Sequence, residues 1–357
     1  MKVKLRDVSN VIMGQSPDSS TYNTKKIGLP FFQGNADFGE LNPIAKTWCS
    51  APIKIAYKNY ILISVRAPIG ALNIAAEKCC IGRGLAALDV NNKMCTQKYL
   101  WYLLKAKKNE LLSKGTGSTF KAISKNILSE MEFNIPPVRE QELCTKALDV
   151  VFYLIRLKKE QLDKLDLLVK SRFIEMFGDP VTNEKGWVKV RLADKCCIIT
   201  GNTPPRANEK YYGSYIEWIK SDNITSSMYL TKAAEYLSEE GLAVGKKVES
   251  GSVLMTCIAG SLKSIGNVAI ADRPVTFNQQ INAVVTNEQN TLFMYEQFKL
   301  TKEYITCDVN MALKGILSKG QLSEKQFIFP PIELQNQFAD FVAQVDKSKF
   351  VVTAKFQ

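Results

Sequence analysis

The sequence predicts an α+β protein in which one globular domain occurs twice and each copy is followed by a long helix. Two pairs of repeated segments support this prediction. The segment "IPPVREQ" (135–141) returns as "FPPIELQ" (329–335), and "VKLRDVSNVIMGQSP" (3–17) returns as "VKVRLADKCCIITGNTP" (188–204). The offsets of 194 and 187 residues are as long as a domain, whereas a solenoid unit has about 20–50 residues. We therefore expect a pseudo-twofold internal repeat.

The repeated Pro-Pro pair marks the end of each globular domain, because proline stops regular structure and the following residues are polar and helix-prone. The expected division of the chain has four parts: a first globular domain at 1–137, a central helix at 138–180, a second globular domain at 181–331 and a shorter C-terminal helix at 332–357.

The central segment reads as one helix from Arg139 to Phe177, because it contains neither Pro nor Gly and its apolar residues recur every seven positions. A helix of this length, roughly 58 Å, needs a partner for its apolar stripe. The C-terminal segment offers a matching stripe, so we expect an antiparallel coiled coil. Two amphipathic helices packed on their own domains remain the alternative. The expected contact residues are Leu148, Ile155, Leu162, Leu165, Val169, Phe338, Phe341 and Val345.

Within each globular domain, short β-rich runs predict a mostly antiparallel sheet. The expected strands lie at 60–65, 85–90, 252–258, 267–271 and 281–286. Residues 98–115 are expected to form a helix that becomes basic towards its end, with a weaker counterpart at 294–305.

The charge distribution suggests a polyanionic partner. The chain has a net charge of +12, and residues 1–137 alone contain 19 basic and 9 acidic side chains. A domain this basic points first to nucleic acid. A soluble basic protein without such a partner is the alternative.

The residue types also exclude several functions. The chain has no histidine, which excludes a histidine base or metal ligand. Nine scattered cysteines lack a C-x-x-C pair, so we expect reduced thiols in a cytoplasmic protein. No apolar stretch is long enough for a membrane span, and no glycine-rich cofactor loop is recognisable. We therefore expect no catalytic residues, no metal and no cofactor.

Candidate DNA contacts come from polar and basic residues in turn-like segments. Arginine suits guanine, and Asn or Gln suits adenine. Lysines, hydroxyls and glycine amides suit phosphate oxygens. Each of these residue types is also common in ordinary turns. The candidates are Gln15, Arg66, Arg83, Lys114, Thr116, Ser118, Lys121, Asn202, Asn278, Gln279, Gln280, Lys314 and Lys319.

Several segments together resemble the specificity (S) subunit of bacterial type I restriction-modification enzymes. They are "LPFFQG" (29–34), "VRAPIG" (65–70), "IGRGLAAL" (81–88), the two Pro-Pro segments and "FIEMFGDPVTNEKGW" (173–187). The resemblance covers nearly the whole chain. It implies two target recognition domains, each reading one half of a split site on double-stranded DNA, separated by helices that form an antiparallel coiled coil.

The resemblance also implies the partners. The helices would bind two modification (methyltransferase) subunits and, through them, restriction subunits. These partners would methylate adenine and cut DNA, and they would bind S-adenosylmethionine, ATP and Mg. The C-terminal helix of about 24 residues is shorter than the family's second spacer. We therefore expect either a truncated sequence or a central helix whose far half pairs with a partner subunit.

A second function remains open, namely a stand-alone sequence-specific or architectural DNA-binding protein. Specific binding that appears only with a methyltransferase favours the specificity subunit, and tight specific binding by the chain alone favours the alternative. An enzyme is the third possibility, which an assay of the isolated chain for methyl transfer would test.

Overall fold

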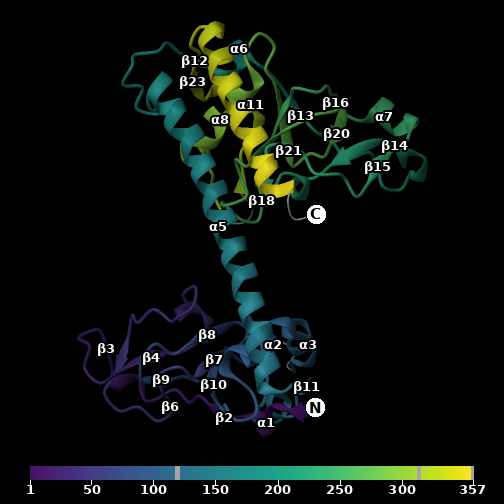
Figure 1. The fold of residues 1–357 in the computed structure, drawn as a ribbon. Coiled ribbons are helices and arrows are strands. Elements are labelled where there is room, and N and C mark those ends of the chain that lie inside the picture. Colours follow the sequence, from purple (N-terminus) through teal and green to yellow (C-terminus); the bar gives the residue numbers. More distant parts are fainter. Residues whose placement is uncertain (117–120, 312–314, 355–357) are drawn as a thin grey trace. The chain divides into compact units, whose positions relative to one another are not determined.

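A computed structural model of the chain describes residues 1–116, 121–311 and 315–354. The chain forms two compact units, Met1–Ile155 and Arg156–Gln357 (Figure 1). The long helix α5 (Val138–Phe177) begins in the first unit and ends in the second. The four-part division drawn from the sequence stays a prediction, although α5 and α11 (Ile332–Ala354) begin directly after the two Pro-Pro pairs.

The elements of the first unit are, in chain order, β1 (Lys2–Lys4), α1 (Leu5–Val8), β2 (Ser9–Met13), β3 (Tyr22–Asn23), β4 (Leu29–Phe32), β5 (Trp48–Cys49), β6 (Ile55–Ala56), β7 (Ile61–Ser64), β8 (Leu72–Ile74), β9 (Cys79–Ile81), β10 (Leu85–Val90), α2 (Gln97–Ala106), α3 (Lys108–Lys114), α4 (Lys125–Ser129), β11 (Glu132–Asn134) and the start of α5.

The second unit continues from α5 with β12 (Lys189–Arg191), α6 (Leu192–Lys195), β13 (Cys197–Thr200), β14 (Tyr212–Ile219), β15 (Tyr236–Leu237), α7 (Glu239–Val244), β16 (Lys247–Val248), β17 (Val253–Thr256), β18 (Ile258–Ala259), β19 (Val268–Ile270), β20 (Val275–Phe277), β21 (Ile281–Val285), α8 (Thr291–Leu300), α9 (Lys302–Thr306), β22 (Gly315–Ile316), α10 (Lys319–Glu324), β23 (Gln326–Ile328) and α11.

The sheet topology shows the internal repeat directly. An antiparallel four-stranded sheet, β2-β10-β7-β8, recurs as β13-β21-β17-β19. A second sheet lies beside each, β3-β5-β4-β9-β6 in the first unit and β15-β14-β20-β16 in the second, and each contains one parallel pair, β4 with β9 and β14 with β20. The pairing of β1 with β11 recurs as β12 with β23. The expected α+β class and duplicated domain are confirmed.

Each four-stranded sheet is covered on both faces, which explains its nearly continuous apolar strands. In β7, Ile61 and Ile63 belong to one core cluster and Leu62 to another. In β17, Val253 and Leu254 likewise lie in separate clusters. Successive strand residues point to opposite faces, so a strand buried on both faces loses the alternation of apolar and polar residues. The expected strands are all present, with ends shifted by one or two residues.

The prediction of a single helix at 98–115 is wrong in one respect, because the structure has two helices there. Helix α2 ends at Ala106, Lys107 leaves helical geometry (φ −89°, ψ 14°), and α3 follows. The second unit has the same break at Thr301, between α8 and α9. The bend allows both Leu104 and Leu111 to reach the same core.

The contact between α5 and α11 lies in the second unit and is antiparallel. Phe173 of α5 packs edge-on against Phe338 of α11 at a centroid distance of 5.3 Å. Further back along α5, Asp166 pairs with Lys349, which lies further forward in α11. Residues that come earlier in α5 therefore contact residues that come later in α11, so the two helices are antiparallel. The expected pairing of the two helices is confirmed for this part of α5.

The expected seam residues divide into two groups. Val169, Phe338 and Val345 are buried, whereas Leu165 and Phe341 are partly buried against the same core. Leu148 and Leu162 are half-buried, and Ile155 is 48% exposed. A helix of 23 residues is roughly 35 Å long, and one of 40 residues roughly 60 Å. Helix α11 is therefore too short to cover α5 along its whole length.

A buried glutamine joins each globular unit to the helix that follows its Pro-Pro pair. Gln141, with no exposed surface, donates from Nε2 to the carbonyls of Pro136 and Met94, both at 2.9 Å, and accepts from the Thr96 N–H at 2.9 Å. Thr96 caps α2. The side chain therefore fixes the start of α5 against the start of α2.

The second unit repeats this arrangement through Gln335, which is 1% exposed. Its Nε2 donates to the Pro330 carbonyl at 2.8 Å, and its Oε1 accepts from the N–H of Asn290, the cap of α8, at 3.0 Å. The repeated Gln of "PPVREQ" and "PPIELQ" thus has the same structural role twice.

Replacing Gln141 with Ala should lower the free energy of unfolding by about 1–3 kcal/mol, because a partly buried N–H and two partly buried carbonyls lose their partner. Urea denaturation followed by far-UV circular dichroism measures this change. Gln161→Ala, at an exposed position of the same helix, is the matched control and should change the midpoint little. Equal effects of the two substitutions would contradict the role given to Gln141.

Candidate nucleic-acid interface

Several backbone segments of the first unit meet at one end of the four-stranded sheet. The Gly14 N–H donates to the Leu85 carbonyl at 2.9 Å, and the Gln15 N–H to the Ile81 carbonyl at 3.0 Å. The approach is so close that a Cβ at Gly14 would lie 2.2 Å from the Gly82 carbonyl oxygen. We call this group the first loop edge and define it as residues 14–16, 33–34, 65–66, 82–84, 116 and 121–123.

The other segments of the first loop edge are joined in the same way. Gly82 donates to the Phe32 carbonyl at 2.8 Å, Val65 to that of Gly84 at 2.9 Å, and Ile123 to that of Val65 at 2.8 Å. Main-chain hydrogen bonds therefore fix the path of these segments, and glycine is required where a Cβ would collide, as at Gly14.

Most of the DNA-contact candidates of the first unit lie at this edge. Thr116 pairs its backbone with Ala122, and Arg66 forms a bridge with the same residue. The candidates Gln15, Arg66, Arg83, Thr116 and Lys121 are all exposed. The structure thus brings together residues that are more than 100 positions apart in the sequence.

Another candidate of the first unit, Lys114, does not belong to the first loop edge. Lys114 is at the end of α3 and pairs with Glu110 at 2.7 Å. Glu110 also pairs with Lys107 at 2.6 Å, and the hydrogen bonds from Lys107 and Lys114 lower the pKa of the Glu110 carboxyl. The charge of Lys114 is therefore partly balanced. Ser118 lies outside the described residues.

The second unit repeats the same main-chain bonds. Gly201 donates to the Ile281 carbonyl at 3.0 Å, and Asn202 to that of Phe277 at 3.1 Å. A Cβ at Gly201 would lie 2.2 Å from the Asn278 carbonyl oxygen, the same distance as at Gly14. We define the second loop edge as residues 201–203, 220–221, 257–260, 278–280 and 315–317.

The remaining bonds give residue equivalences between the two edges. Asn278 donates to the Ile219 carbonyl at 3.0 Å, Cys257 to that of Gln280 at 2.7 Å, and Leu317 to that of Cys257 at 2.8 Å. Through these bonds, Arg83 corresponds to Gln279, Arg66 to Ile258 and Gln33 to Lys220. Each loop edge therefore has one backbone frame and different side chains.

Two candidates of the second unit have amide groups that bond to other parts of the unit. Asn202 donates from Nδ2 to the Val244 carbonyl at 2.8 Å and accepts from the Lys246 N–H at 3.0 Å. Both ends of its amide thus hold a neighbouring loop. Asn278 is only 6% exposed and accepts from the Gln280 N–H at 3.0 Å.

The other candidates of the second unit remain accessible to different degrees. Gln279 is exposed and accepts a hydrogen bond from the Thr203 hydroxyl. Gln280 is half-buried, and Lys319 is exposed in the first turn of α10. Lys314 lies outside the described residues.

The sequence reasoning missed a cationic cluster beside the second loop edge. Glu235 pairs with Arg206 at 2.7 Å and also with Lys220. The Arg206 guanidinium lies 4.5 Å from the ring centre of Tyr212 and 4.9 Å from that of Trp218. Hydrogen bonds from Lys220 and Arg206 outweigh partial burial and lower the pKa of Glu235.

A sequence signal for Lys220 was available. The segment "PFFQG" (30–34) corresponds to "EWIKS" (217–221) at an offset of 187, the same offset as between the two Gly-x-x-Pro segments. This alignment places Lys220 opposite Gln33 without any structure. No comparable signal identifies Glu235, whose pairing with Lys220 depends on the fold.

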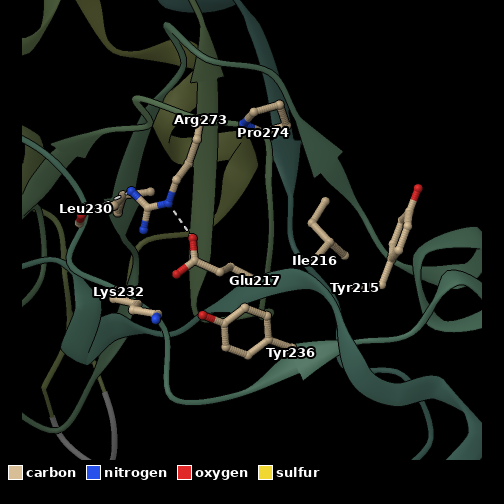
Figure 2. A pocket seen from close by; sticks show the side chains of 8 residues that line it. All are labelled: Tyr215, Ile216, Glu217, Leu230, Lys232, Tyr236, Arg273 and Pro274. Carbon is tan, nitrogen blue, oxygen red and sulfur yellow. Dashed lines mark hydrogen bonds and ion pairs between the residues drawn. The ribbon is translucent and has the colours of Figure 1, made fainter.

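A hollow of about 480 Å³ on the second unit is lined by an ion pair between Glu217 and Arg273. Figure 2 shows this pair among the lining side chains. Glu217 also accepts from the Ala233 N–H at 2.8 Å. Arg273 donates to the Leu230 and Thr231 carbonyls at 3.4 and 3.1 Å. The pair thereby ties β14, which leads to Lys220, to segment 230–233.

The pKa of Glu217 reflects this environment. Burial opposes its ionisation, but the hydrogen bonds from Arg273 and Ala233 and the charges of Arg273 and Lys232 outweigh it, so the pKa of Glu217 is lowered. The carboxylate is therefore charged at neutral pH and acts as a structural anchor.

Among the described residues, no group of three or more His, Cys, Asp or Glu side chains could hold a metal ion. Burial raises the pKa of Cys79 and of Cys257 to about 12, which disfavours thiolate formation. None of the helices in the described part of the chain has an apolar stretch that could cross a membrane.

The comparison with known families decides the identity. Residues 1–167 and 184–355 match the family described as "Type I restriction modification DNA specificity domain". The chain belongs to this family. The specificity subunits of the family are not catalytic and have no cofactor of their own; their partner subunits carry the catalysis.

Two relatives from Methanocaldococcus jannaschii illustrate the range of similarity. The putative type I restriction enzyme MjaX specificity subunit is 40% identical over 161 residues, which cover 45% of this chain and 38% of the relative. The type I restriction enzyme MjaIX specificity subunit is 24% identical over 369 residues, which cover 95% of this chain and 85% of that relative. The chain thus spans well under two thirds of the first relative and most of the second.

A solved structure supports the fold of this specificity-domain chain. The crystal structure of the type I restriction-modification S subunit from M. genitalium has a TM-score of 0.56 at 15% identity and covers 99% of this chain and 91% of that one. At this identity the similarity concerns the fold alone. It agrees with two β-rich units and the long helices α5 and α11.

Glu217→Gln should destabilise the second unit by about 1–3 kcal/mol at pH 7, because the charged hydrogen bonds to Arg273 weaken. The folded pKa is below the ordinary value of 4.5, so this contribution is present above pH 4.5 and is lost as the pH falls through the folded pKa.

Hydrogen exchange of β14 and β20, measured at pH 7 and at pH 4, tests this expectation. The substitution should speed exchange more at the higher pH. Glu209→Gln, at an exposed position of the same unit, controls for the loss of a charge. A pH-independent effect of Glu217→Gln would contradict the ionic role.

Proposed function

We propose that this chain is the DNA-reading specificity subunit of a type I restriction-modification enzyme and that each of its units reads one half of a split site on double-stranded DNA. The observation that carries the proposal is the repeated loop edge, in which one frame of main-chain bonds presents different exposed polar residues in each unit. The net charge of +12 and the family membership support a DNA ligand. We place the protein in the cytoplasm, where its nine thiols remain reduced.

The proposed partners are modification subunits, two for each chain, and restriction subunits bound through them. These partners would bind S-adenosylmethionine, ATP and Mg and perform adenine methylation and DNA cleavage. Helix α5 offers a surface for a modification subunit, because Val151, Leu154 and Ile155 are 43–48% exposed although all three are apolar.

The alternative is a DNA-binding protein that acts alone. The two proposals differ in what the purified chain does. A stand-alone protein should bind a specific sequence tightly by itself, whereas the subunit should acquire full specificity only with its modification partners. Gel-shift competition between target and scrambled DNA, with and without these partners, distinguishes them.

Arg83→Ala should weaken the preference for the recognised base at one position of one half-site. The free energy that discriminates against other bases there should fall by about 1–3 kcal/mol if a bidentate contact is lost. Lys121→Ala should instead weaken binding to all sequences alike. It should also lower the number of counterions released on DNA binding by about one, which reduces the salt dependence of the affinity. Methylation-site mapping and salt titrations with the assembled enzyme measure both effects.

Lys146→Ala is the matched control for Lys121→Ala, since Lys146 is exposed on α5 and belongs to neither loop edge. If Arg83→Ala changes the salt dependence and leaves the sequence preference intact, then Arg83 contacts phosphate. If neither Arg83 nor Lys121 affects DNA binding, the first loop edge is not the DNA surface.

Val151→Glu should reduce binding of a modification subunit at least tenfold, because a charge replaces an apolar side chain in a surface that becomes buried on assembly. Co-purification and titration by fluorescence anisotropy measure this affinity. Lys159→Glu, at an exposed polar position of α5, is the control for the added charge. Unchanged binding by Val151→Glu would place the partner surface elsewhere.

A further inference from the structure

Two side-chain amides at the second loop edge interlock and fix each other's orientation. Asn278 accepts from the Gln280 N–H at 3.0 Å through Oδ1. A backbone N–H can only donate, so the atom facing it must be the Asn278 oxygen. The Asn278 Nδ2 therefore points the other way, and it donates to the Gln280 Oε1 at 3.1 Å.

The orientation of the Gln280 amide follows from that of Asn278. Its Oε1 accepts from Asn278 and also from the Ser221 hydroxyl, at 3.4 Å. Both lone pairs of the oxygen are thus in use. No acceptor among the described residues bonds to the Gln280 Nε2, so what this amide offers to a ligand is its two N–H donors.

The Gln280 side chain lies where a ligand can reach it. It is half-buried and lines a hollow of about 360 Å³ at the second loop edge, together with Ser221, Ile258, Ala259 and Gly260. The equivalent position in the first unit is Gly84, where a Cβ would lie 2.4 Å from the Gln33 carbonyl oxygen. The first unit therefore has no room for this amide, which is a feature of the second unit alone.

We infer that Gln280 reads the keto oxygen of guanine or thymine in the half-site of the second unit. This inference rests on the proposed function and deepens it. In the major groove, guanine O6 and thymine O4 are acceptors, whereas adenine N6 and cytosine N4 are donors. A glutamine that contacts adenine through both of its amide groups must accept from N6. The Gln280 Oε1 cannot accept from N6, because the Asn278 amide and the Ser221 hydroxyl already donate to it.

The sequence-based expectation for Asn278, Gln279 and Gln280 is adenine, because Asn and Gln suit that base in general. The structure replaces this expectation for two of the amides. Asn278 is buried and acts as a positioning residue. Gln280 retains only its donors and selects against the amino bases adenine and cytosine.

The experiment uses the full chain assembled with its modification subunits and begins with mapping of the methylated sites. Gln280→Ala should lower the preference for the recognised base about tenfold at one position of one half-site. Duplex oligonucleotides then carry, at that position, a base analogue that lacks the major-groove keto oxygen: 2-aminopurine for guanine or 5-methyl-2-pyrimidinone for thymine. The analogue should weaken binding of the unmodified chain about tenfold and leave that of Gln280→Ala unchanged.

The decisive variant is Asn278→Asp, which differs from the natural residue in one group. Its carboxylate still accepts the Gln280 N–H through one oxygen. Its second oxygen replaces the Nδ2 donor, repels the Gln280 Oε1 and attracts Nε2. The amide of Gln280 should therefore turn over and present its oxygen to the DNA, so the preferred pair should change by a transition, from G·C to A·T or from T·A to C·G.

Gln280→Glu provides an independent version of the same test, because it presents a carboxylate oxygen without depending on a rotation of the amide. It should cause the same transition and keeps the inference falsifiable if Asn278→Asp fails to fold. Gln326→Glu, at an exposed position of β23, controls for the added negative charge and should leave the recognised sequence unchanged.

The outcomes separate this inference from the proposed function. A transition at the position relaxed by Gln280→Ala supports the inference. It is overturned if Gln280→Ala relaxes no position, if both acidic variants keep the original base, or if only analogues that lack the amino group of adenine or cytosine weaken binding. If the assembled chain methylates without any sequence preference, the proposed function fails, and the inference falls with it.

Discussion

The close approach of two backbone segments at Gly14, and again at Gly201, is the constraint on which both loop edges depend. A side chain at either glycine would collide with a carbonyl oxygen of the loop that carries Arg83 or Gln279. Because the glycines leave this space open, the neighbouring amides can bond directly to the loop carbonyls. The loops thus take their shape from the main chain, so their side chains can vary without loss of the frame.

Much of the fold could be predicted from the sequence, because its signals are local or repeated. The Gly-x-x-Pro and Pro-Pro-x-x-x-Gln segments revealed the duplication. The structure adds their physical reasons: the glycine permits close packing, and Gln141 and Gln335 bond the cap of one helix to the start of another. The long helix α5 was predictable because its apolar residues recur every seven positions. Its incomplete cover by α11 follows from the lengths of the two helices.

The candidate site was predictable in position but not in chemistry. The sequence located the loops of Arg83 and Gln279 because glycines and amides cluster there. It could not show that both ends of the Asn202 amide hold a loop around residues 244–246, nor that Asn278 turns inward. The Asn202 bonds join residues 42 and 44 positions apart, and the burial of Asn278 depends on tertiary packing. The break at Lys107 was missed for a similar reason, because it serves the tertiary packing of Leu104 and Leu111.

The two loop edges share a frame but differ in how they can bind a polyanion. The first exposes Arg66, Arg83 and Lys121 within a domain that has a large excess of basic residues. In the second, the positions of the two arginines hold Ile258 and Gln279, and Glu235 partly balances the charges of Lys220 and Arg206. Charge–phosphate contacts depend strongly on salt, whereas contacts between amides and base edges depend on it weakly. We therefore expect the first unit to supply most of the salt-sensitive affinity, while the second contributes mainly hydrogen-bond selectivity.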